Sequence, residues 1–151
     1  GVPMSSLVNR LLSTDAGFAP LAVRVPVGII FAAHGAQKLF GWIGGYGLAG
    51  TGQFMESIGL SPGTLMAALA GGAEFFGGLA LLIGLAVRPA SVVLAFTMLI
   101  AIFSAHFSKG LFLANGGYEY ALALLAVTVG LVFSGAGRVS VDATLGRGTA
   151  R

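Results

Sequence analysis

The chain has 151 residues, of which 56% are hydrophobic and only 9% are charged. This composition excludes an ordinary soluble domain, because too few polar residues remain to form a surface that faces water. Cysteine is absent, which excludes disulfides, thiolate metal sites and iron–sulfur clusters within this chain. The formal charge of +3 is too small for a nucleic-acid-binding surface. The composition is that of an integral membrane protein.

Residues 1–20 are modestly polar and predict a short surface segment before a first membrane span at about Leu21–Gly41. That span matches the ~20 residues needed to cross about 30 Å of hydrocarbon. At about 100° per residue, charged and small residues share one side of this helix, and the other side has nothing polar. The predicted inward side is Arg24, Gly28, Phe31, Gly35, Lys38 and Trp42, with His34 on its flank, and the lipid side is Ile29, Ala32, Ala33, Ala36 and Phe40.

A long glycine-rich connection is expected from Gly44 to Gly63, on the outer side of the membrane. Inside it, Thr51 is a candidate N-cap for a short interfacial helix. Three further spans are expected at about Thr64–Ala86, Ala90–Phe107 and Tyr118–Phe133. The predicted fold is therefore all-α: an integral membrane four-helix bundle over residues 21–136, followed by a polar tail at 137–151.

Two of these spans carry an acidic residue on a face of small residues. In the second span, Glu74 shares its face with Ala67, Ala70, Gly71, Gly77 and Gly78, and Leu65, Leu69, Phe76, Leu79 and Ile83 lie opposite. In the fourth span, Glu119 heads a face that continues through Ala123, Ala126 and Gly130. Because small residues allow close packing and charges avoid lipid, both acidic faces are predicted to pack inward.

Four spans place both chain ends on the same side of the membrane. Six arginines fall on or near that side, and only Lys38 and Lys109 fall on the other; the six are Arg10, Arg24, Arg88, Arg138, Arg147 and Arg151. Positive charge is enriched on the cytoplasmic side of membrane proteins. The N- and C-termini are therefore predicted to be cytoplasmic.

Each span also contributes an ionisable group to the outer half of the predicted bundle. The group comprises His34, Lys38, Glu74, His106 and Glu119, while Arg24 and Asp142 lie toward the cytoplasmic end. These residues are candidates for ligand binding or a proton relay, because charges without a purpose are costly in a membrane. Structural pairs such as Lys38 with Glu119, or His34 with Glu74, are the alternative.

The sequence resembles the DoxX family of small four-span bacterial membrane proteins. The resemblance rests on the RxxxGxxFxxHGxQKLFG pattern at 24–41, the AEFFGGLALLIG segment with Glu74, and the Arg88 turn. It continues through the His106 region, the Gly-Gly-Tyr-Glu-Tyr run through Glu119 and GAGRVSVD ending at Asp142. The resemblance implies a multi-pass protein of the bacterial cytoplasmic (inner) membrane, linked to quinone-dependent sulfur oxidation and to oxidative stress.

Three functions remain open at this point. The favoured hypothesis is a redox-associated subunit that binds a quinone or similar lipophilic molecule at the polar cluster, with His34 and His106 as weaker candidates for haem or metal ligation. The second is a scaffold, as a monomer or homo-oligomer, that recruits redox enzymes to the lipid bilayer without chemistry of its own. The third is a small proton-coupled transporter centred on Glu74. Whether the chain is itself an enzyme is left open.

Overall fold

The computed structural model describes residues 6–149, and within that range every regular element is a helix. The predicted all-α fold is confirmed for this part of the chain. Arg151 and the side chain of Arg147, both assigned to the predicted basic end, lie outside the description. The elements are α1 (Ser6–Leu12), α2 (Ala19–Phe40), α3 (Gly47–Ser57), α4 (Gly63–Ile83), α5 (Val87–Ala101), the π-helical turn η1 (Ile102–His106), the 3-10 turns η2 (Phe107–Lys109) and η3 (Leu113–Asn115), α6 (Glu119–Ser134) and α7 (Val141–Thr149).

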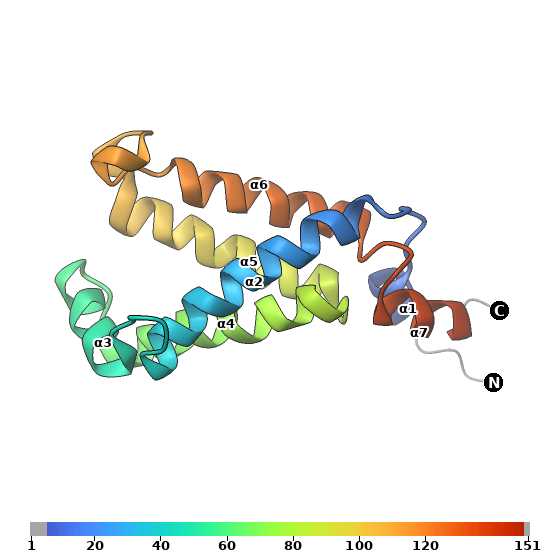
Figure 1. Cartoon of the computed structure of the whole chain (residues 1–151), viewed down its shortest axis with the longest axis horizontal. Helices are drawn as coiled ribbons and strands as arrows, with labels where there is room; N and C mark the ends of the chain where they lie inside the picture. Colours follow the sequence, from blue (N-terminus) through green and yellow to red (C-terminus); the bar gives the residue numbers. More distant parts are fainter. Residues whose placement is uncertain (1–5, 150–151) are drawn as a thin grey trace.

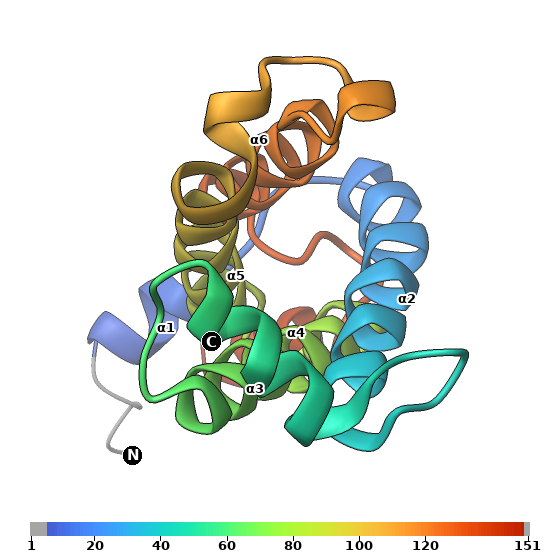
Figure 2. The same cartoon turned by 90° about the vertical axis from the view of Figure 1, so that its left-hand side faces the viewer.

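The helices α2, α4, α5 and α6, called here the central helices, stand around a common axis (Figures 1 and 2). α2 packs most extensively on α4. α4 also packs on α5, and α5 packs on α6. The contact between α2 and α6 is the sparsest of the four neighbouring pairs. Figure 1 shows α3 at one end of the central helices and the pair α1 and α7 at the other.

Within residues 6–149, three helical stretches are long and apolar enough to cross a membrane: Ala19–Phe40, Gly63–Ile83 and Val87–Lys109. α6 is apolar but shorter, with 16 residues. The predicted outward face of the second span is exposed on α4, as Leu65, Leu69, Phe76, Leu79 and Ile83 show. Such a surface is stable in lipid rather than in water, because hydrocarbon replaces the missing protein contacts.

Glycine lets α2 and α4 approach until their backbones touch. A Cβ atom added at Gly35 would lie 2.3 Å from the backbone nitrogen of Phe75, and one added at Gly78 would lie 2.4 Å from that of Ala32. Both distances are shorter than real Cβ contacts allow. The predicted face of α2 that carries Gly28 and Gly35 therefore packs on the small-residue face of α4, but Ala32, which was predicted to face lipid, also lies at this interface.

Some predicted faces are wrong. Ala36 is buried rather than lipid-facing, because α2 contacts α3 and α6 as well as α4. Trp42 is exposed rather than inward, because α2 ends at Phe40 and Gly41 turns the chain with a φ of 73°. Thr51 is a buried residue inside α3 and not its cap, because the helix begins at Gly47.

The Glu119 face of α6 also points outward. Glu119, Ala123, Ala126 and Gly130 are all exposed. The buried side of α6 instead carries Ala121, Leu124, Thr128 and Leu131. α6 packs mainly on α5, and the larger side chains of this second face fill that contact.

Candidate functional site

Near the α1–α7 end, the side chains of Arg24, Arg88 and Asp142 are engaged by backbone groups. Arg24 is 1% exposed, and its guanidinium donates hydrogen bonds to the carbonyl oxygens of Leu81 and Leu82 at the end of α4, and of Ala136 and Val139 after α6. The last carbonyls of a helix have no partner within the helix. Arg24 therefore ties the ends of two helices to the start of a third.

Asp142 and Arg88 act in the same way. The Asp142 carboxylate, 1% exposed, accepts hydrogen bonds from the backbone N–H groups of Ala86 and Val87, 2.7 and 2.9 Å away, and so caps the start of α5. Arg88 donates to Val132 and Phe133 at the end of α6, and also to carbonyls at the end of α1. Arg24 and Asp142 were predicted as candidate site residues toward one end of the bundle. Their hydrogen bonds to backbone groups at helix ends are structural contacts.

Polar side chains from α2, α4, η1 and α6 gather around one pocket of about 140 Å³. Its lining comprises Phe31, His34, Lys38, Glu74, Met98, Ala101, His106, Tyr120 and Leu124. A larger hollow of about 350 Å³ lies between the 12–17 segment and α7, but none of the predicted site residues lines it. The smaller pocket is the candidate functional site, because ionisable and apolar groups converge there.

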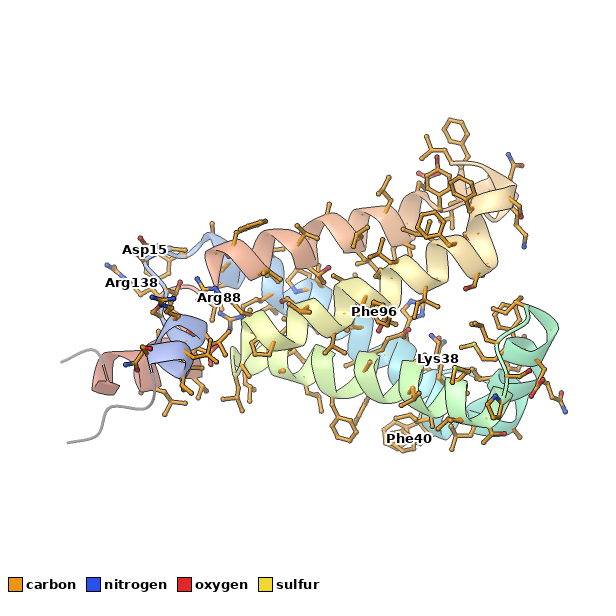
Figure 3. All side chains as sticks on the ribbon, turned by 180° about the vertical axis from the view of Figure 1, so that it is seen from behind. Asp15, Lys38, Phe40, Arg88, Phe96 and Arg138 are labelled. Atoms are coloured by element: carbon orange, nitrogen blue, oxygen red, sulfur yellow. The ribbon has the colours of Figure 1, made fainter. Side chains whose placement is uncertain are left out.

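The strongest electrostatic contact in the pocket is an ion pair between α2 and α4. The Lys38 ammonium donates a hydrogen bond of 2.9 Å to Oε2 of Glu74, which is 4% exposed. Figure 3 shows Lys38 directed toward the other central helices, whereas Phe40 points to the outside. Of the predicted alternatives, neither Lys38 with Glu119 nor His34 with Glu74 is an ion pair here; the pair within residues 6–149 is Lys38 with Glu74.

His106 reaches the pocket from the last residue of the π-helical turn η1. Its Nδ1 lies 2.8 Å from the carbonyl oxygen of Gly116, in the loop that leads to α6. π-helical turns are rare and occur frequently at functional sites, because they change the direction in which a helix presents its side chains.

His34 and Tyr120 line the pocket on the side where α2 and α6 meet. Their ring centroids are 6.2 Å apart, and both residues are exposed. Tyr120 was not among the predicted site residues. Helical spacing could have identified it, since residue 120 lies one turn before the buried Leu124 on the same face of α6.

Glu119 does not join the pocket. Its Oε2 accepts a hydrogen bond of 2.6 Å from the backbone N–H of Leu113, the first residue of η3, and the side chain is exposed. The structure therefore brings together four of the five predicted outer-half residues, and Tyr120 supplies the contribution of α6.

The size and lining of the pocket restrict what it can hold. A cavity of about 150 Å³ accommodates a benzene-sized ring, whereas sites that enclose whole drug-sized ligands measure about 300–1,000 Å³. The pocket therefore fits a single ring but not a haem between His34 and His106. Among residues 6–149, no three His, Asp or Glu side chains form a group that could hold a metal ion. Phe31, Met98 and Leu124 supply an apolar lining against which a ring can pack.

Comparisons with known proteins agree with the family suggested by the sequence patterns. The DoxX family model matches residues 19–107, which is more than half of the chain. A Bacillus subtilis (strain 168) protein named "Putative oxidoreductase CatD" is 36% identical over 114 residues, covering 76% of this chain and 78% of that protein. The "Inner membrane protein YqjF" of Escherichia coli (strain K12) is 36% identical over 133 residues, covering 84% and 92%. No solved structure matches the chain. The chain is a membrane protein that belongs to the DoxX family.

Proposed function

We propose that this protein binds the ring of a quinone or a similar lipophilic molecule in the pocket between the central helices. The observation that carries the proposal is the convergence of His34, Lys38, Glu74, His106 and Tyr120 on a space the size of one ring. The Lys38 ammonium has three N–H donors and uses one of them for Glu74, so donors remain for a ring oxygen. The name of the Bacillus relative supports an association with redox chemistry.

The proposal includes a membrane arrangement in which α2, α4, the 87–109 stretch and α6 all cross the bacterial inner membrane, with both chain ends in the cytoplasm. The side-by-side placement of α1 and α7 supports it (Figure 1). At a rise of about 1.5 Å per residue, α6 is somewhat shorter than the hydrocarbon layer, which membranes accommodate by local thinning.

Because the chain has no cysteine, single cysteines report this topology without background. In intact cells, a membrane-impermeant maleimide should label Ser57→Cys in α3 from outside. It should label Ser6→Cys in α1 only after the membrane is permeabilised. Labelling of Ser6→Cys from outside would contradict cytoplasmic termini.

Binding can be tested with decyl-ubiquinone, titrated into the purified protein in detergent and followed by calorimetry and native mass spectrometry. We expect one quinone per chain. Lys38→Met should weaken binding roughly tenfold or more, since a hydrogen bond to a charged group contributes about 1.5–3 kcal/mol. Glu119→Gln is the matched control, because Glu119 lies outside the pocket and its loss should leave the affinity unchanged.

Three results would contradict the proposal. Absence of stoichiometric quinone from the wild-type protein would favour a scaffold that recruits redox enzymes, and co-purification would then be the next measurement. Equal weakening by Lys38→Met and Glu119→Gln would show that binding does not depend on the pocket. Proton-dependent uptake into proteoliposomes that Glu74→Gln abolishes, without quinone binding, would favour the transporter.

A further inference from the structure

The hydrogen bond between His106 and the 110–117 loop fixes where the imidazole carries its proton. Nδ1 of His106 lies 2.8 Å from the Gly116 carbonyl oxygen, and a carbonyl oxygen can only accept. Nδ1 must therefore be the protonated nitrogen in this contact. In a neutral imidazole the other nitrogen, Nε2, then has a free lone pair and acts as an acceptor.

The partners of His106 leave Nε2 as its acceptor atom. Within residues 6–149 the ion pair is Lys38 with Glu74, and no carboxylate pairs with His106. With Nδ1 donating to Gly116, the neutral imidazole offers Nε2 as an acceptor, in contrast to the donors of Lys38 in the same pocket.

From this polarity we infer that the pocket selects the hydroxyl-bearing, reduced form of its ring ligand, which donates a hydrogen bond to Nε2 of His106. This inference rests on the proposed function. A hydroquinone or phenol ring carries an O–H donor that matches the acceptor. An oxidised quinone ring carries only carbonyl acceptors, so it can use the donors of Lys38 but leaves Nε2 of His106 without a partner.

The backbone around His106 holds its ring in one orientation. The π-helical turn ends at His106, and the ring is hydrogen-bonded to the carbonyl oxygen of Gly116, in the loop before α6. His34, the other histidine of the pocket, has no comparable backbone hydrogen bond within residues 6–149 and is exposed beside Tyr120 of α6.

The experiment compares decyl-ubiquinol with decyl-ubiquinone, titrated separately into the purified protein under anaerobic conditions. The wild-type protein should bind the quinol several-fold tighter, up to about tenfold, as expected for one hydrogen bond. His106→Asn should reduce this ratio to about one, because the Asn amide can still donate to Gly116 from the position of Nδ1 but has no atom at Nε2. Glu119→Gln, outside the pocket, should keep the wild-type ratio.

His106→Gln covers the case in which His106→Asn does not fold. Its amide reaches the position of Nε2 and can accept there, so part of the quinol preference should remain even though the bond to Gly116 is lost. Equal binding of the two forms by the wild-type protein, or a wild-type ratio in His106→Asn, would overturn the inference and leave the proposed function standing. Binding of neither form would overturn both.

Discussion

Arg24 and Lys38 lie about four turns apart on the same helix, and their surroundings differ in kind. The guanidinium of Arg24 donates to carbonyl oxygens on two neighbouring segments and is 1% exposed. The ammonium of Lys38 has one side-chain partner, Glu74, and borders a pocket. A buried charged group whose hydrogen bonds go to backbone carbonyls stabilises the fold. A charged group that has unused hydrogen-bond donors beside a cavity can bind a ligand. Sequence position alone does not separate the two cases.

The largest expected effect comes from removing the backbone-bound charge. Arg24→Leu should lower the free energy of unfolding by more than about 3 kcal/mol, because each buried carbonyl left unpaired costs about 1–3 kcal/mol. Arg24→Lys should recover only part of this loss, because an ammonium cannot match the planar fork that reaches α4 and the segment after α6. Thermal unfolding in detergent, read by circular dichroism, measures both. If Arg24→Leu were about as stable as the wild-type protein, the proposed difference between a structural Arg24 and a ligand-binding Lys38 would be wrong.

The pocket charges should behave in the opposite way. Replacing both partners together, as Lys38→Met with Glu74→Gln, should change the free energy of unfolding by less than about 1 kcal/mol. The reason is that replacing a buried ion pair by uncharged residues often leaves the stability unchanged. Quinone binding should be lost in the same protein. Glu74→Gln alone should be less stable than the double variant, because it leaves the Lys38 ammonium without its partner. Unfolding of the double variant as severe as that of Arg24→Leu would make the ion pair structural.

The smallest effect is expected at Glu56, which links α3 to the first residue of α4. Its carboxylate accepts hydrogen bonds from the Ser61 hydroxyl and the backbone N–H of Gly63, and these hold the pKa of Glu56 below its ordinary value of 4.5. Because the folded pKa is the lower one, this contact contributes stability above about pH 4.5, and the contribution is lost as the pH falls through the folded pKa.

Glu56→Gln should therefore reduce the fall in melting temperature between pH 6 and pH 3 by a small amount. Asp15→Asn, which removes an exposed carboxylate before α2, is the matched control. An identical dependence of the melting temperature on acid pH in Glu56→Gln and the wild-type protein would show that the Glu56 hydrogen bonds do not form in solution.

The sequence by itself determined the helical class and the approximate positions of the central helices, whereas α7 was predicted only as part of a polar tail. Long uncharged stretches have no other stable form in a membrane, because every backbone polar group must be paired within the segment. The small-residue face of α4 was also predictable. Gly71, Glu74 and Gly78 recur at helical spacing, the glycines allow close packing, and the charged side chain must avoid lipid. The predicted cluster of His34, Lys38, Glu74 and His106 followed from estimates of depth along the helices.

Only the tertiary structure decided how each charge is used. Periodicity shows that Arg24 and Lys38 share a side of α2, but not that carbonyls from two distant segments meet Arg24. The rotation of α6 could not be predicted either. Its Glu119 face and its Tyr120 face are both plausible in sequence, and packing against α5 selects the one with larger apolar side chains. Such choices depend on contacts between segments far apart in the chain, which local spacing does not encode.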